Sequence, residues 1–158
     1  MGMLVWLESS PLAVWVHESP SVWAQPTVLT LHTMGMAVLV GASWVLDLRL
    51  LGISRNIPLS AFRWVFRAVA VGLIVNLVTG ALLFAQRATT WGTSIPFLIK
   101  MILVVASVAT LVPLRSHLRL GDAQQREDSG RARFLAIVSI LAWTGAITVG
   151  RLLAYLVP

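Results

Sequence analysis

The sequence contains no cysteine among its 158 residues. Disulfide bonds, thiolate metal sites, Fe–S clusters and a cysteine nucleophile are therefore excluded. Charged residues are also scarce, because they form 11% of the chain where a soluble domain has about 25%. With 58% hydrophobic residues and a mean hydropathy of +0.85, the chain could not cover a globular surface with polar groups. These values indicate an integral membrane protein.

Acidic residues are fewer than basic residues, six against twelve, which gives a net charge of +6. Such a balance can indicate binding to nucleic acid. The arginines of this chain, however, flank apolar runs and form no patch on a soluble fold, which is typical of residues that set membrane topology. We therefore expect a lipid bilayer and no nucleic acid as the surroundings of the protein.

Four apolar runs are long enough for a membrane helix, since a bilayer core of about 30 Å needs about 20 helical residues. They cover residues 26–46, 64–85, 96–114 and 134–157. Most of the connections between them are short, so consecutive helices should run in opposite directions. The predicted fold is all-α: an integral-membrane four-helix up-down bundle over residues 26–158.

Residues 1–25 differ from the four runs because they combine Trp6, Trp15 and Trp23 with Glu8 and Glu18. Tryptophan favours the membrane–water interface, so this segment predicts short interfacial helices on the outer surface. It lacks the positive start of a secretory signal peptide, and we expect it to stay on the mature protein.

Arginine is concentrated in two of the three connections between the runs, whereas the middle connection, "QRATTWGTSIP", has Arg87 alone. Positively charged loops stay on the cytoplasmic side, so both termini should lie outside. The two arginine-rich connections contain Arg49, Arg55, Arg63, Arg67, Arg115, Arg119, Arg126, Arg131 and Arg133.

His32 lies about two helical turns inside the first run, toward the predicted outer face. Imidazole is the commonest metal ligand, and an ionisable residue inside a membrane is a candidate functional residue. The alternative is a neutral histidine that hydrogen-bonds another helix. His17 would join His32 if the N-terminal segment returned over the bundle; otherwise it is a solvated interfacial residue. Met34, Met36 and Met101 offer a soft copper(I) site near His32, or are simply packing residues.

Three cations are predicted at about the depth of His32 or just above it: Lys100, Arg151 and Arg87. Snorkelling to the membrane surface explains each of them alone. Together with polar stripes on two helices they favour a shared pocket for an anion or for a cofactor with carboxylates, such as haem. The stripes contain Asn76, Thr79 and Arg87 on the second run, and Thr144, Thr148, Arg151 and Tyr155 on the fourth.

Asp47 and Arg49 close the first run. A carboxylate near the C-terminus of a helix opposes the helix dipole and needs a cation. We predict a structural ion pair with Arg49, or with Arg63 or Arg67 of the same connection. A proton or ion relay is the alternative, but the predicted spans contain no second acidic residue.

The motifs "LHTMGMAVLVG", "DLRLLG", "TGALLF", "PFLIKMILV" and "WTGAITVGRLLAY" follow one another along the chain. Together, over residues 32–155, they resemble a family of uncharacterised bacterial four-helix inner-membrane proteins. The resemblance implies a multi-pass protein of the bacterial inner (plasma) membrane. It draws attention to His32, Asp47, Arg49, Lys100 and Arg151 and implies no particular activity.

The "LH…VG" start of the first run is also similar to membrane proteins related to copper-resistance CopD and to b-type cytochromes. Those haem bundles usually carry paired histidines on facing helices, whereas this chain has one histidine within a span. A bis-histidine haem would therefore need His17, and a His/Met haem would need Met101.

The leading functional prediction is a small haem-b-binding or redox-accessory membrane protein with its site at the outer, periplasmic face. We expect an electron-transfer or accessory protein rather than an enzyme, since no Ser/His/acid set and no carboxylate pair is predicted at the same depth in the membrane. One alternative is a cofactor-free accessory subunit that packs against a larger membrane complex or a second copy. Another is a transporter or binder of a small anion or copper. The predicted cofactor residues are His32 as axial ligand, His17 or Met101 as the second ligand, Lys100 and Arg151 at the propionates, and Arg87 in support.

Overall fold

The computed structural model describes residues 2–19, 21, 23–53, 57, 59–117 and 129–156, and among these residues every regular element is a helix. The prediction of an all-α fold is therefore confirmed. The elements are α1 (Gly2–Glu8), α2 (Pro11–Glu18), α3 (Gln25–Leu51), the 3₁₀ helix η1 (Leu59–Phe62), α4 (Arg63–Ala85), α5 (Ala88–Gly92), α6 (Ile95–His117) and α8 (Ser129–Leu156).

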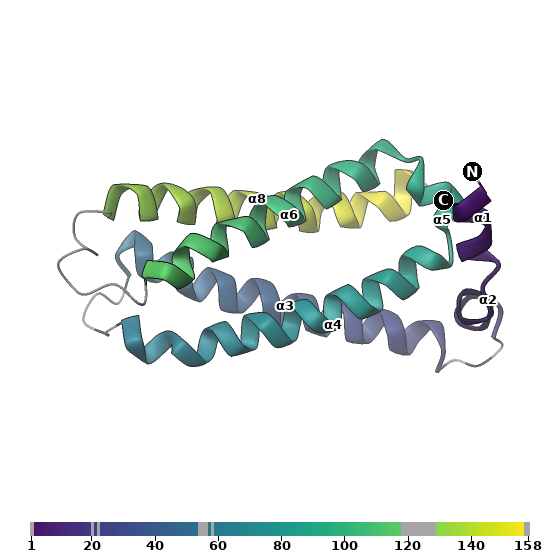
Figure 1. The fold of residues 1–158 in the computed structure, drawn as a ribbon, viewed down its shortest axis with the longest axis horizontal. Coiled ribbons are helices and arrows are strands. Elements are labelled where there is room, and N and C mark those ends of the chain that lie inside the picture. The colour runs from purple at the N-terminus through teal and green to yellow at the C-terminus, as the bar shows by residue number, and fades with distance from the viewer. Residues whose placement is uncertain are drawn as a thin grey trace.

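The four long helices α3, α4, α6 and α8 are each long and apolar enough to cross a membrane. They lie roughly along one axis as a bundle (Figure 1). The prediction of a four-helix, multi-pass membrane bundle is confirmed by this arrangement. Many large apolar side chains of these four helices point outward and are exposed, as expected for helices surrounded by lipid tails.

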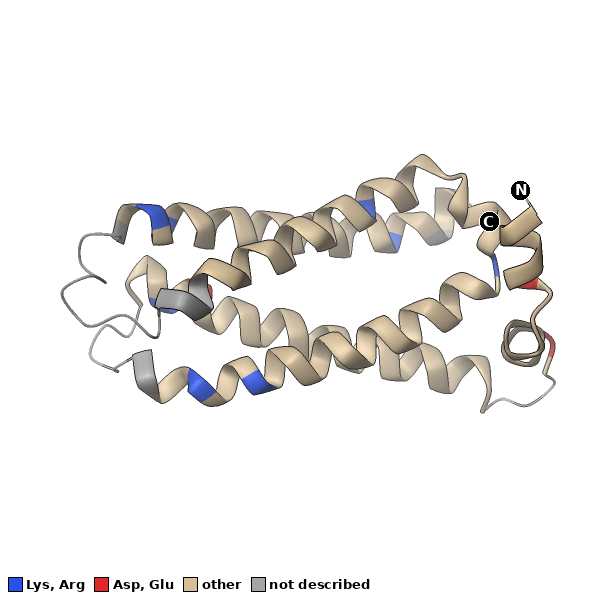
Figure 2. Cartoon of the chain, viewed as in Figure 1, with Lys and Arg blue, Asp and Glu red and all other residues tan. Residues whose placement is uncertain are grey.

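The bundle has two different ends (Figure 1). We call one the α5 end, because α1, α2 and α5 lie there with the start of α3 and the end of α8. We call the other the arginine end, where α3 and α6 end and α4 and α8 begin. Figure 2 shows basic residues on the helix turns at the arginine end, and these are Arg49, Arg63, Arg67, Arg131 and Arg133. Arg55, Arg119 and Arg126 lie outside the described residues.

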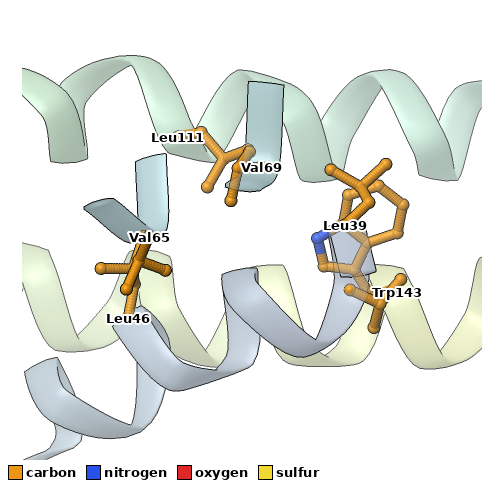
Figure 3. Close-up of a cluster of buried hydrophobic side chains, with 7 residues drawn as sticks. Leu39, Leu46, Val65, Val69, Leu111 and Trp143 are labelled. Carbon is orange, nitrogen blue, oxygen red and sulfur yellow. The ribbon is translucent and has the colours of Figure 1, made fainter. Parts of the chain in front are cut away.

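The long helices pack in the order α4, α3, α8, α6. Helix α3 contacts α4 along its length and also packs on α8, while α6 packs mainly on α8. The shared core contains Leu39, Leu46, Val65, Val69, Leu111 and Trp143 (Figure 3). It joins all four helices toward the arginine end.

Small residues allow α3 and α4 to approach closely, as in many membrane helix pairs. A Cβ atom added to Gly72 would lie 2.8 Å from the backbone nitrogen of Leu39 and 2.9 Å from the carbonyl oxygen of Gly35. Both neighbours are backbone atoms of α3 and cannot turn away. Gly72 is therefore required by this contact.

The N-terminal segment covers the α5 end of the bundle. Helix α1 packs on α5 and α4, and α2 packs on α4. Ser10 caps α2 by accepting a hydrogen bond from the backbone nitrogen of Ala13 at 3.4 Å, and Pro11 occupies the first helical turn. That this segment lies at a membrane interface stays a prediction.

Candidate functional site

His32 on α3 is linked to α4 through Thr79. The His32 Nδ1 and Thr79 Oγ1 atoms lie 2.9 Å apart, and Thr79 Oγ1 donates to the carbonyl oxygen of Val75 at 2.6 Å. A hydroxyl has one hydrogen, which Thr79 gives to Val75. His32 must therefore donate from Nδ1, and in the neutral ring Nε2 carries the lone pair.

Gly80 makes room for the imidazole beside Thr79. A Cβ atom at position 80 would lie 3.3 Å from His32 Cε1, which is tighter than ordinary van der Waals contact. The ring is half-buried between α3 and α4. A hydrogen bond to Thr79 thus holds the ring on one side, and Gly80 leaves room for it on the other.

Lys100 on α6 extends across Gly150 of α8. A Cβ atom at position 150 would lie 3.3 Å from Lys100 Cε and 3.5 Å from Lys100 Nζ. The lysine is partly buried, and its ammonium group is close enough to act electrostatically on His32. Two of the predicted site residues, one on α3 and one on α6, therefore lie within electrostatic range of each other.

The other predicted cofactor residues are more exposed than His32 and Lys100. Arg151 follows Gly150 and is exposed, Arg87 is the exposed residue that precedes α5, and Met101 is 37% exposed on α6. His17 is exposed on α2, where it acts electrostatically on Glu8. Within the described part of the chain, no hydrogen bond links His17 or Met101 to His32.

The polar stripe predicted on the fourth run does not face the interior. Thr144, Thr148, Arg151 and Tyr155 are all exposed, and that this stripe lines a shared pocket stays a prediction. Both threonines donate to carbonyl oxygens of their own helix, at 2.8 Å, and therefore need no polar neighbour. The face of α8 that packs on α6 carries glycine instead, with Gly145 against Leu103.

Glu8 attaches α1 to α5 outside the membrane-spanning helices. Its Oε2 accepts from the backbone nitrogen of Thr89 at 2.9 Å and from Thr89 Oγ1 at 2.5 Å. These hydrogen bonds, the side-chain one first, hold the pKa of Glu8 below its ordinary value. A carboxylate also suits this place because it faces the free N–H groups at the start of a helix. Sequence patterns did not reveal this contact, since it joins positions 81 residues apart.

Asp47 and Arg49 have different partners. Arg49 donates from Nε and Nη2 to the carbonyl oxygen of Ile57, at 3.0 and 2.8 Å. Asp47 is 2% exposed and lies beside the Ser139 hydroxyl of α8, although the geometry is too poor for a well-formed hydrogen bond. The structure therefore does not bring the predicted pair together, because residues two apart on a helix point to different sides.

Among the described residues, no group of three or more His, Cys, Asp or Glu side chains could hold a metal ion. No protein-family model, curated protein or solved structure matches the chain. Function is therefore argued from the site alone.

Proposed function

We propose that this chain is a small haem-b-binding, redox-accessory protein of the bacterial inner membrane, with His32 as the axial ligand. The observation that carries the proposal is the hydrogen-bond chain from His32 through Thr79 to Val75. Histidines that bind metals usually donate their second ring N–H to a protein group, which fixes the ring and the tautomer. Here Nδ1 makes that bond and Nε2 is left as the ligand atom.

Lys100 supports haem more than a bare metal ion. Haem carries two propionates, and the ammonium group of Lys100 on α6 lies within electrostatic range of the histidine. Arg151 and Arg87 have long side chains at the same end of the bundle, where they would reach the propionates from the surface. A bound haem would supply reversible one-electron transfer, while these residues would hold it and bury its ring.

The chain offers one clear axial ligand. The second is assigned to His17 on α2 or to Met101 on α6, and the variants His17→Ala and Met101→Ala distinguish them. If neither variant changes the reduced spectrum, the second position is open in this protein and the haem is held by His32 alone.

The orientation proposed for the bundle places the arginine end in the cytoplasm and both termini in the periplasm. Six arginines of the described helices lie at that end, and positively charged helix ends are retained on the cytoplasmic side. His32 and Lys100 then lie toward the periplasmic face, where an electron partner of the cell envelope would meet the protein.

The experiment that tests the proposal is a haem titration of the detergent-purified, cofactor-free protein. Wild-type protein should bind one haem per chain and develop a shifted Soret band that saturates. His32→Ala should abolish saturable binding. His17→Ala should keep the wild-type Soret band if Met101 or no protein group is the second ligand, and should change it if His17 is that ligand. Equal binding by wild type and His32→Ala would show that haem enters the micelle or the bundle without this ligand.

A second candidate is a cofactor-free accessory subunit, favoured by one face of α3. Thr33, Ala37 and Gly41 follow one another at four-residue spacing and are exposed, and no atom lies within 4 Å of a Cβ added to Gly41. Small residues at this spacing let a second membrane helix approach closely. Because the chain has no cysteine, Ala37→Cys can be tested for disulfide dimers in membranes, with Leu31→Cys on another face as the control. Cross-linking of Ala37→Cys but not of Leu31→Cys would support this face of α3 as a contact between helices.

A further inference from the structure

Asp47 is buried at the arginine end of the bundle, away from the pair formed by His32 and Lys100. It is 2% exposed, and Ser43, one turn earlier on α3, has no exposed surface at all. Ser139 on α8 is also fully buried and lies beside the Asp47 carboxyl group. Asp47 and Ser139 therefore form a buried polar pair between two helices.

Both partners of this pair have an unused polar atom. Asp47 Oδ2 and Ser139 Oγ have no hydrogen-bond partner within the described part of the chain. The neighbouring hydroxyl of Ser43 does not supply a donor, because it gives its hydrogen to the carbonyl oxygen of Leu39 at 2.8 Å. The site thus has a carboxyl oxygen and a hydroxyl on two packed helices, both buried and both without a hydrogen-bond partner among the described residues.

No described cation forms an ion pair with Asp47. Helices α4 and α8 pack against α3, and their basic residues at this end are exposed, while Arg49 on α3 itself donates to Ile57. An ionised carboxylate without a cation is very unfavourable in such surroundings. The charged or titratable residues at this end of the helices are Arg49 on α3, Arg63 and Arg67 on α4, Arg115 and His117 on α6, and Arg131 and Arg133 on α8.

We propose that Asp47 and Ser139 form an intramembrane proton-binding site, in which Asp47 is a carboxylic acid that donates its O–H to the Ser139 hydroxyl. One proton satisfies both unused atoms and removes the buried charge. The proton comes from water at the arginine end and returns there when Asp47 ionises. Because no second acidic residue lies within the described spans, the site binds and releases a proton without passing it to another carboxylate.

The first test uses N,N′-dicyclohexylcarbodiimide, an apolar reagent that adds to protonated carboxylic acids and forms a stable N-acylurea. The full chain in lipid vesicles is treated at a series of pH values, and the adduct is located by mass spectrometry after proteolysis. We expect one adduct, on Asp47, that decreases as alkaline pH removes the proton. Asp47→Asn should lose it, whereas Glu8→Gln, a variant at a surface carboxylate, should keep it.

Added Na⁺ tests whether the Asp47 and Ser139 oxygen atoms bind a proton or a metal cation. At constant pH, added Na⁺ should leave the labelling of Asp47 unchanged. Protection by Na⁺ would overturn the proposal, because it would mean that a metal cation rather than a proton occupies the pair.

A second measurement does not depend on access of the reagent. The infrared spectrum of wild type minus Asp47→Asn should contain the C=O stretch of a protonated carboxylic acid, shifted in ²H₂O. Ser139→Ala should shift the frequency of this band, because the carboxylic acid loses its hydrogen-bond acceptor. This variant retains the Asp47 carboxyl group, so it also tests the proposal if Asp47→Asn fails to fold. A carboxylate band in place of the acid band at neutral pH would overturn the proposal.

Discussion

The imidazole of His32 donates to the hydroxyl of Thr79, 2.9 Å away on the neighbouring helix. This contact fixes the ring and leaves Nε2 as the free ligand atom. It also joins α3 to α4 at the end of the bundle where Lys100 lies. The proposed cofactor site depends on this relationship more than on any other contact of the molecule.

Thr79→Val should weaken haem binding while keeping the shape of the side chain. The variant removes the acceptor for His32 Nδ1, so the ring loses its fixed tautomer and orientation. Loss of such an outer partner typically weakens metal binding about 10- to 100-fold. A haem titration measures the change, with Thr33→Val on the exposed face of α3 as the control. Unchanged affinity in Thr79→Val would mean that Thr79 does not orient the ligand.

Lys100→Met should lower the midpoint potential of the bound haem. A cation near haem stabilises the reduced, more negative form, so its removal favours the oxidised form. Potentiometric titration of wild type and variant gives the shift directly. Arg151→Met is the matched comparison, and we expect a smaller shift because Arg151 is exposed and better screened. A shift of the opposite sign would place Lys100 away from the haem.

Gly72→Leu should destabilise the bundle strongly. The new side chain would meet the backbone of α3 at 2.8 Å, so the helices must separate. Overpacking of this kind typically costs about 1–3 kcal/mol. Gly41→Leu is the control, because no atom lies within 4 Å of a Cβ at that position. Thermal or denaturant unfolding in detergent should separate the two variants, and equal stability would contradict the close approach of α3 and α4.

Acid should release α1 from α5. The pKa of Glu8 is lowered in the folded protein by its hydrogen bonds to Thr89, so the ionised carboxyl stabilises the contact. This stability is present above the ordinary value of 4.5 and is lost as the pH falls through the lower folded value. Hydrogen exchange of the Thr89 amide, compared between wild type and Glu8→Gln at each pH, measures the contact.

The wild-type amide should be more protected than that of Glu8→Gln at neutral pH, and the difference should vanish at low pH. Glu18→Gln, at an exposed position of α2, should behave as wild type. A difference between wild type and Glu8→Gln that persists in strong acid would contradict the role of the carboxylate.

The spans were predicted from the sequence because hydropathy over about 20 residues directly reports burial in lipid. The helix ends were less accurate. Helix α8 begins at Ser129 rather than at 134, and α3 continues to Leu51 rather than to 46. In both cases a helix continues past the apolar run into residues that include arginine. Hydropathy identifies the part of a helix that lies in the membrane core, whereas the helix itself extends as far as its backbone hydrogen bonds remain favourable.

The site was predicted only in part. His32, Lys100 and Thr79 are unusual residues in apolar surroundings, so the sequence reveals them. The neighbour of Asp47 was not predicted, because Arg49 is near in sequence while Ser139 approaches only when α3 packs on α8. Glu8 and Thr89 meet for the same reason, since their contact requires the N-terminal segment to return over the α5 end.

The most direct measurement is the reduced-minus-oxidised spectrum of protein purified from cells supplied with a haem precursor, together with its haem content per chain. The proposal predicts about one b-type haem per chain in wild type, with sharp α and β bands on reduction, and none in His32→Ala. Folded wild-type protein that is colourless under these conditions would contradict the proposed function.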